Sequence, residues 1–272
     1  MRFGGFLRAS VVAMRNILVG GNLVSLSLWR QPRRMLSYIN EVLFLYRGFT
    51  GSHGLSQRNV YQVLPASDTV SIQIGSLRSR DSGGGTWFDR VPSHATDIIS
   101  LCLLAQILKP RVVFEIGTLR GYTALHFALN TPEESHVYTL DLPQDQPLEP
   151  RLETTLLDAQ HIAAHGAAQP YHFHGTPVEH KITCLFGDSA AFDFSPYYEQ
   201  VDLFFIDGAH SYEYVRSDTL NALKCCHTGS VVAWHDFGRM GVNGVSRWLR
   251  EFSAENRIYS VPGGSLAFMV LQ

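Results

Sequence analysis

The chain has 272 residues, of which 45% are hydrophobic and 17% are charged, with a formal net charge of -2. This composition excludes a disordered, fibrous or collagen-like chain, and the length suffices for one large α/β domain with extensions. The charge is uneven: residues 1–60 hold eight arginines and a single acid, hence +7, whereas residues 61–272 carry -9. A basic arm and an acidic body are therefore expected, and the acidic body argues against a nucleic-acid partner.

The four cysteines, at positions 102, 184, 225 and 226, form neither a CxxC motif nor a Cys/His zinc spacing. Free thiols in a reducing cytosol are the simplest interpretation, and disulfides are the alternative. We therefore expect a cytoplasmic protein.

The basic arm, residues 1–60, is rich in apolar residues with arginines interspersed. Its longest uncharged run, 16–29, has 14 residues, whereas a transmembrane helix needs about 20. Three interpretations stay open: a helical arm that packs on the body or supports dimerisation, a helix lying on an anionic membrane surface, or a targeting segment. Residues 61–90 are expected to be a linker whose Gly-rich part, 80–90, forms either a flap over the site or a turn.

The body, residues 91–272, alternates helical and strand patterns. Helical spacing runs from Ala95 to Leu108 and stops at Lys109-Pro110. Short apolar runs typical of buried parallel strands occur at 112–117, 136–142, 181–189, 201–208 and 230–236. Further helices are expected at 121–130, 152–164, 212–226 and 243–253.

Gly229 is interpreted as the end of the helix before the fifth strand. The last two strands flank Pro262-Gly263-Gly264, and this pattern predicts an antiparallel hairpin. Five alternations of strand and helix predict an α/β fold with a doubly wound, mostly parallel sheet. The hairpin brings the sheet to seven strands and is expected to supply one antiparallel edge strand.

Polar residues interrupt the apolar pattern where each predicted strand ends. In an open α/β sheet, ligands bind beyond the carboxyl ends of the strands, where the strand order reverses. The sequence therefore predicts a single site at this edge, built from Glu115 and Gly117, Asp141, Asp188 and Ser189, Asp207 and His210, and His235 and Asp236.

The turn "EIGTLRGYT" (115–123) brings backbone close to a ligand but is not the dinucleotide fingerprint, because Leu119 stands where that motif needs glycine. A diphosphate loop is therefore disfavoured. Asp141, at the next strand end, suits a ribose diol, and Asp188 with Ser189 is expected near a base. The set indicates a nucleoside without phosphates, although each glycine alone is also explained by turn chemistry.

The stretches "FEIGTLRGYTAL", "VYTLDLP", "GDSAAFDFSPY", "FIDGAHSYEYVRSD" and "VVAWHDFG" resemble those of class I S-adenosylmethionine-dependent methyltransferases of Rossmann-like fold. Within that superfamily the likeness is to small-molecule O-methyltransferases of the catechol type and macrolide-sugar type, and it covers residues 90–272. The resemblance implies S-adenosylmethionine as cofactor and a cofactor site made of Glu115, Gly117, Thr118, Gly121, Thr123, Asp141, Asp188 and Ser189. It places Glu115, Gly117 and Thr123 at the methionyl part.

The same resemblance implies catalytic roles for Asp207 and His210 and a divalent metal, Mg²⁺ or Mn²⁺, on Asp207, His235 and Asp236. His210 takes the position of the general base, where lysine is common, and its ordinary pKa near 6.5 suits a base at neutral pH. His235 replaces an acid, which lowers the negative charge offered to a hard cation. The competing interpretations are a helix cap for Asp207 and aromatic packing for His210.

The predicted function is methyl transfer from S-adenosylmethionine to a hydroxyl of a small molecule, assisted by the metal. The alternatives are a metal-independent methyltransferase with His210 as base, and a nucleoside- or metal-binding protein with another reaction such as hydroxylation. The insert 143–180 is expected to wall the acceptor pocket. Nearby aromatic residues suggest an uncharged or aromatic acceptor or a sugar: Tyr171, Phe173, Tyr197, Tyr198, Trp234 and Phe237.

Overall fold

The computed structural model describes residues 55–66, 69–75, 95–143, 149–164, 170–239 and 242–272. The expectations for the basic arm up to residue 54 and for the flap at 80–90 lie outside the described residues. The chain divides into two compact units, 1–48 and 49–272, and every described residue belongs to the second. Within these ranges each helix is too short or too polar to cross a bilayer.

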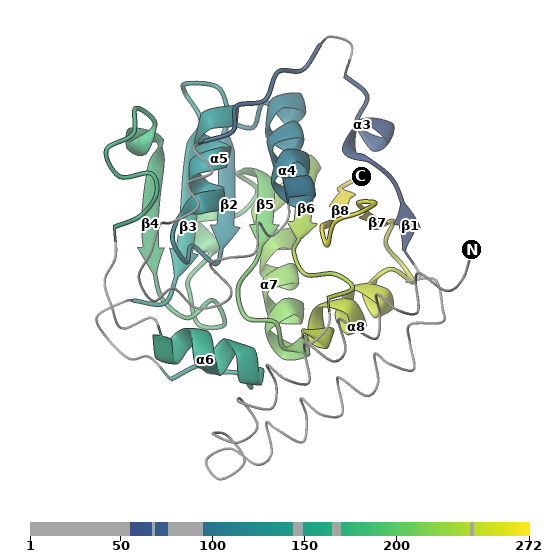
Figure 1. The fold of residues 1–272 in the computed structure, drawn as a ribbon. Helices are drawn as coiled ribbons and strands as arrows, with labels where there is room; N and C mark the ends of the chain where they lie inside the picture. Colours follow the sequence, from purple (N-terminus) through teal and green to yellow (C-terminus); the bar gives the residue numbers. More distant parts are fainter. Residues whose placement is uncertain (1–54, 67–68, 76–94, 144–148, 165–169, 240–241) are drawn as a thin grey trace, which may run out of the picture. The chain divides into compact units, whose positions relative to one another are not determined.

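An eight-stranded sheet in the order β1-β7-β8-β6-β5-β2-β3-β4 forms the centre of this unit (Figure 1). Strands β2 to β6 run parallel, and β8 is antiparallel to β6 and β7. This confirms the doubly wound, mostly parallel fold. The strands are β1 (Ser56–Gln57), β2 (Val112–Ile116), β3 (His136–Asp141), β4 (Ile182–Phe186), β5 (Val201–Ile206), β6 (Cys226–Trp234), β7 (Tyr259–Ser260) and β8 (Ala267–Val270).

Two hydrophobic cores cover the two faces of the sheet because neighbouring residues of a strand point to opposite sides. Val113 packs in the core formed with α4 and α5, whereas Phe114 packs in the core formed with α7 and α8. Burial on both faces explains why these strands are continuous apolar runs. The helices are α3 (Val60–Val63), α4 (Ala95–Leu108), α5 (Tyr122–Asn130), α6 (Leu156–Ala164), α7 (Tyr212–Cys225) and α8 (Asn243–Phe252).

The far edge of the sheet differs from the sequence-based expectation. Strand β8 lies between β6 and β7 and is not an edge strand. An eighth strand, β1, pairs in parallel with β7, so that Ser56 lies opposite Tyr259. Two residues are too few to give a period-2 pattern, and their partner is about 200 residues away in the chain, so no local signal marked this strand.

Two element boundaries were also wrong. Gly229 does not end a helix: α7 ends at Cys225, and Gly229 lies within β6 with φ of 90°. The register between β5 and β6 shifts in this region, which is the usual reason for a glycine inside a strand. Helix α6 begins at Leu156, four residues later than expected, because Thr155 caps it.

Candidate functional site

The carboxyl ends of β2 to β6 lie at one edge of the sheet because these strands are parallel. The strand order reverses beside β2, since the chain proceeds to β3 and β4 on one side and to β5 and β6 on the other. Backbone hydrogen bonds continue past the strand ends, from Gly117 N to Leu140 O (2.8 Å) and from Asp207 N to Ile116 O (2.8 Å). The turns that carry the predicted site residues are thus held side by side.

The turn after β2 packs closely against its neighbours at two glycines. Gly117 has φ of 100°, and a Cβ atom there would collide with the carbonyl oxygen of Asp207. Gly121, which begins α5, has φ of 68°, and its Cβ atom would collide with the ring of Phe173. Both positions combine a left-handed backbone with a close approach, so both require glycine.

Asp141 fixes this turn from the end of β3. Its Oδ2 accepts a hydrogen bond from Leu119 N at 2.6 Å, and its Oδ1 accepts from Leu142 N at 2.7 Å. Leu119 itself is more than half exposed. Thr123 lies in the first turn of α5, partly exposed beside the same turn.

Glu115 is buried beneath the turn with an exposed fraction of 1%. Thr139 Oγ1 donates to Glu115 Oε2 at 2.5 Å, and Thr118 Oγ1 lies 2.6 Å from Thr139 Oγ1. Burial raises the pKa of Glu115 well above its ordinary value, and the charges of Asp207 and Asp141 raise it further, against the opposing effect of the Thr139 hydrogen bond. Burial beneath the turn therefore favours the protonated form of this carboxyl group.

Asp188 and Ser189, at the end of β4, are both buried. Asp188 accepts hydrogen bonds from Arg151 N (2.7 Å), Ala190 N (2.9 Å) and the Tyr214 hydroxyl (2.9 Å). The carboxylate therefore ties the segment before α6 and helix α7 to the β4 turn. Nearby, burial raises the pKa of Asp218 on α7 to about 7.

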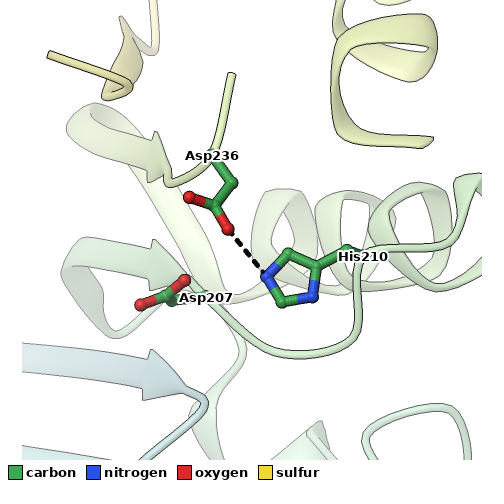
Figure 2. Close-up of side chains that lie close together, drawn as sticks. All are labelled: Asp207, His210 and Asp236. Carbon is green, nitrogen blue, oxygen red and sulfur yellow. Dashed lines mark ion pairs between the residues drawn. The ribbon is translucent and has the colours of Figure 1, made fainter. Parts of the chain in front are cut away.

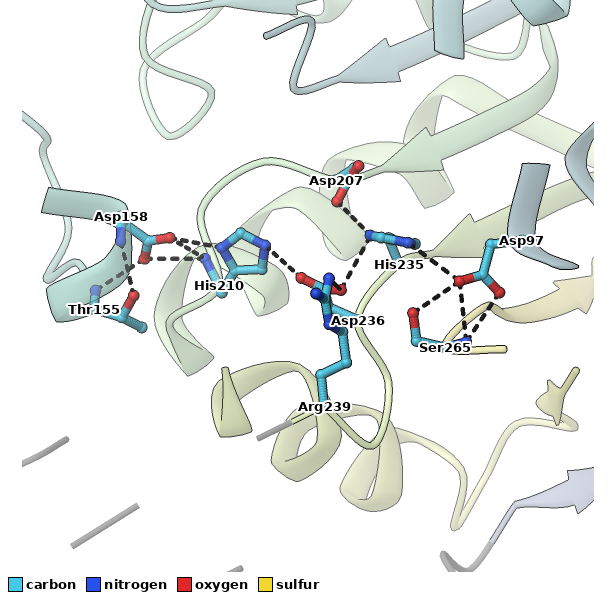
Figure 3. Close-up of polar contacts among 9 residues, drawn as sticks. All are labelled: Asp97, Thr155, Asp158, Asp207, His210, His235, Asp236, Arg239 and Ser265. Atoms are coloured by element: carbon cyan, nitrogen blue, oxygen red, sulfur yellow. Dashed lines mark hydrogen bonds and ion pairs between the residues drawn. The ribbon is translucent and has the colours of Figure 1, made fainter. Parts of the chain in front are cut away.

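His210 lies between two carboxylates (Figure 3). Its Nδ1 is 2.6 Å from Asp158 Oδ1, and its Nε2 is 3.0 Å from Asp236 Oδ2. Its backbone N also donates to both carboxylate oxygens of Asp158, at 3.2 and 3.1 Å. Neither ring nitrogen is left unpaired, so the packing alternative considered for His210 is not what the structure shows.

His235 lies between a second pair of carboxylates. Its Nδ1 is 3.0 Å from Asp207 Oδ1 and 3.1 Å from Asp236 Oδ1, and its Nε2 is 3.4 Å from Asp97 Oδ2. Asp97 in turn accepts from the backbone and hydroxyl of Ser265 in the β7–β8 turn. Arg239 makes a further ion pair with Asp236. We call the set of Asp97, Asp158, Asp207, His210, His235, Asp236 and Arg239 the carboxylate–imidazole network.

Contacts within the network favour the charged forms of both histidines and of Asp236. Burial opposes protonation of His210, but the charges and hydrogen bonds of Asp158 and Asp236 outweigh it and raise the His210 pKa well above 6.5. Burial likewise opposes protonation of His235, and Asp207 with Asp236 raises its pKa. The two imidazolium groups and Arg239 outweigh burial at Asp236 and hold its pKa below the ordinary value. The ordinary pKa near 6.5 therefore does not describe His210 in this environment, and its role as a general base stays a prediction.

Asp207, His210 and Asp236 each offer one ligand atom, and these atoms lie within 4.8 Å of one another (Figure 2). His235, which was expected among the metal ligands, is outside this group and contacts both of its carboxylates. Two carboxylates and an imidazole are a suitable donor set for a divalent ion. Metal-binding histidines almost always donate their second ring N–H to a carboxylate, as His210 does to Asp158. The residues present therefore fit a divalent metal.

Sequence reasoning missed Asp97, Asp158 and Arg239. A local signal existed for Asp158: "TLLD" (155–158) is a helix capping box, in which Thr155 N donates to Asp158 Oδ2 at 2.9 Å and Asp158 N donates to Thr155 Oγ1 at 3.1 Å. It predicts a helix start and says nothing of His210. Asp97 looked like an ordinary first-turn acid of α4.

Most of the aromatic residues considered for the acceptor pocket have other partners. Trp234 is fully buried and donates its N–H to Thr219. Phe173 is buried and stacks on Tyr171 with ring centres 5.0 Å apart, above Gly121. These two rings thus cover the turn after β2. Tyr198 is exposed.

Comparison with known proteins adds a family match. Residues 114–237, which include every site residue predicted from the sequence, match the family model described as "Methyltransferase domain". No protein with a curated description matches the chain.

Several solved structures are similar to part of this chain. The O-methyltransferase TomG of Streptomyces achromogenes, involved in tomaymycin synthesis and solved with SAM, is 20% identical, with a TM-score of 0.47 over 67% of this chain and 83% of that one. An O-methyltransferase of Bacillus cereus in complex with SAH is 19% identical, with a TM-score of 0.45 over 85% and 90%.

Proposed function

We propose that this chain, whose residues 114–237 match the family model of a methyltransferase domain, transfers the methyl group of S-adenosylmethionine to a hydroxyl oxygen of a small molecule, with a divalent metal as helper. One observation supports this above the others. The glycine turn after β2 and the Asp207/His210/Asp236 group lie on adjacent strand ends, so a cofactor on the first would face an acceptor on the second.

The cofactor half is assigned from the chemistry of the turn and of the neighbouring strand ends. The start of α5, beside Gly121, offers backbone N–H groups and a positive dipole end to the methionyl carboxylate. Asp141 suits the ribose hydroxyls. A cationic sulfonium or ammonium group near Glu115 would favour the ionised form of that buried carboxyl. Thr118 and Thr123 border the methionyl part.

Ser189 is assigned to the adenine side, at the end of β4. Asp188 is assigned an indirect role there, because its carboxylate already accepts from Arg151 N, Ala190 N and Tyr214. It keeps the β4 turn in position beside the cofactor.

Asp207, His210 and Asp236 would hold the metal. When bound, a divalent ion lowers the pKa of the acceptor hydroxyl and orients its oxygen. His210 is proposed as a ligand through Nε2, where the sequence alone suggested a general base. An imidazole ligand favours Mn²⁺, Fe²⁺ or Zn²⁺ over Mg²⁺. His235 and Arg239 reduce the negative charge of the two carboxylates and orient them.

The chain contributes mainly alignment and charge. The acceptor oxygen forms a bond to the methyl carbon, the carbon–sulfur bond breaks to release S-adenosylhomocysteine, and the hydroxyl proton leaves to solvent. Holding donor and acceptor in line supplies much of the acceleration in such displacements. The close contact of Gly117 with Asp207 keeps the two halves of the site adjacent.

The test is transfer of labelled methyl from S-adenosylmethionine to a panel of phenols, glycosides and lipid-like alcohols, with and without a chelator. We expect labelled product, loss of turnover with chelator, and recovery with Mn²⁺. Asp207→Asn should lower turnover by about 100-fold or more while changing the cofactor Kd little. His227→Gln is the control, because His227 lies near the amino-terminal end of β6, away from the candidate site.

Three other outcomes separate the alternatives. Turnover that survives the chelator would favour a metal-independent methyltransferase. Cofactor binding without any transfer of label would indicate a binding protein or another reaction at the metal. Wild-type turnover in Asp207→Asn would contradict the assignment of the site.

A further inference from the structure

Asp158 belongs to the carboxylate–imidazole network although it lies on α6, outside the strand ends. Its side chain is 4% exposed and contacts three donors: the ring Nδ1 of His210 at 2.6 Å, the backbone N of His210 at 3.1 Å, and Thr155 N at 2.9 Å. A buried carboxylate without such partners would be strongly destabilising. The geometry therefore pairs α6 with the turn after β5.

The two contacts with His210 determine how its ring is presented. A carboxylate at Nδ1 requires the proton on that nitrogen, which leaves Nε2 as the atom facing Asp236, 3.0 Å away. The additional hydrogen bond from the His210 backbone N holds the main chain of His210 as well as its ring. Orientation and tautomer are thus both specified from α6 (Figure 3).

We propose that Asp158 is a positioning residue for the metal: by holding His210 at Nδ1, it aims Nε2 at the space between Asp207 and Asp236 and raises the affinity of the site for a divalent ion. The proposal rests on the proposed metal-assisted function. Asp158 need not touch metal, cofactor or acceptor. Loss of such a second partner typically weakens metal binding by about 10- to 100-fold.

The experiment is titration of the full-length protein with Mn²⁺ by calorimetry, and with Co²⁺ by visible absorption, which reports the nitrogen ligand. Asp158→Asn keeps the shape of the side chain and removes its charge. We expect about 10- to 100-fold weaker Mn²⁺ binding, an altered Co²⁺ spectrum and an unchanged cofactor Kd.

Thr155→Ala is the matched control because it removes the other half of the capping box without touching His210. Loss of such a cap lowers the free energy of unfolding by about 1 kcal/mol. If Asp158 acts only by stabilising α6, Thr155→Ala should weaken metal binding as Asp158→Asn does, and this would overturn the proposal. We expect its Mn²⁺ affinity to stay within about twofold of wild type.

A double-mutant cycle separates a specific effect of Asp158 on His210 from a general loss of folded protein. In a His210→Gln background the charge partner of Asp158 is already absent, so adding Asp158→Asn should change Mn²⁺ affinity by less than about twofold. Equal effects of Asp158→Asn in both backgrounds would overturn the inference. Failure of the wild-type protein to bind any metal would instead overturn the metal-assisted function, and the inference with it. Cofactor binding would be the independent sign of a folded protein.

Discussion

At the scale of single residues, Glu115 is a buried carboxyl group whose ionisation is unfavourable in the folded protein. It is buried, its pKa is raised, and its one described hydrogen-bond donor is Thr139. In the unfolded chain a glutamate ionises near pH 4.3. Between that pH and its raised pKa, the native protein binds more protons than the unfolded chain, so the free energy of unfolding falls as pH rises.

Glu115→Gln should remove this penalty. We expect the cofactor-free variant to be more stable than wild type at neutral pH, by about 1.4 kcal/mol for each pKa unit of the shift, and equally stable near pH 4. If Glu115 meets the cationic part of the cofactor, the same change should weaken S-adenosylmethionine binding by about 10-fold or more. Urea denaturation at several pH values and calorimetry measure the two effects. A variant less stable than wild type at pH 7 would contradict the argument.

At the scale of elements, the turn between β2 and α5 combines two constraints that are normally separate. Gly121 needs a left-handed backbone, and it also needs space beneath the ring of Phe173. His172 N donates to Arg120 O at 2.9 Å, so the segment that carries Phe173 is joined to the turn. The insert after β3 thus supports the turn after β2, for which we propose a role in cofactor binding, and also contributes α6, whose Asp158 contacts His210.

Gly121→Ala and Gly175→Ala form a matched pair for this element. Both glycines have positive φ, 68° and 72°, but a Cβ atom at Gly175 would meet nothing within 4 Å. We expect Gly175→Ala to lower the free energy of unfolding by about 1 kcal/mol through backbone strain alone. Gly121→Ala should cost at least about twice as much, because the ring of Phe173 must move. It should also weaken cofactor binding, measurable by calorimetry.

Comparison of Gly121→Ala with Gly175→Ala tests whether Phe173 restrains the turn. Equal losses of stability in the two variants, measured by chemical denaturation, would mean that Phe173 does not restrain the turn.

At the scale of the whole molecule, the carboxylate–imidazole network joins segments far apart in the chain. Asp97 lies in the first turn of α4, Asp158 lies in the first turn of α6, and His210 and His235 follow β5 and β6. Ser265, in the last turn of the protein, completes the chain of contacts through Asp97. Ionisation of the network therefore affects the stability of the entire domain.

The pH dependence of stability should reflect this. Asp158 and Asp236 have lowered pKa values, so their contribution is present above about pH 3.8 and is lost as pH falls. His210 and His235 have raised pKa values, so theirs is complete below about pH 6.5 and is lost as pH rises through the folded-state pKa values. We expect the network of the chelator-treated protein to stabilise it most between about pH 4 and 6.5.

Calorimetric Tm values across pH 3–9 test this expectation. In His235→Gln the decrease of Tm with rising pH should become shallower. His227→Gln should follow wild type, because His227 is exposed near the amino-terminal end of β6. A wild-type Tm that stays constant or rises from pH 6.5 to 9 would contradict the raised histidine pKa values.

The sequence by itself determined the central part of the fold and the sheet edge at which the candidate site residues gather. A parallel strand buried on both faces is a short apolar run, so β2 to β6 were visible without tertiary information. The polar residues that end those runs, from Glu115 to Asp236, had to share one edge because the strands are parallel. The turn at Gly117 and Gly121 was equally visible, since only glycine tolerates the backbone it needs.

Tertiary structure alone decided the contacts among the candidate site residues and the far edge of the sheet. The pairing of β1 with β7, and the place of β8 between β7 and β6, depend on contacts between distant segments that no local pattern records. The pKa of His210 depends on Asp158, 52 residues earlier, and that of His235 on Asp207 and Asp97 from two other segments as well as on the adjacent Asp236. A pKa is set by the neighbours that folding brings together, and that is why the ordinary value near 6.5 does not describe His210, which lies between two carboxylates.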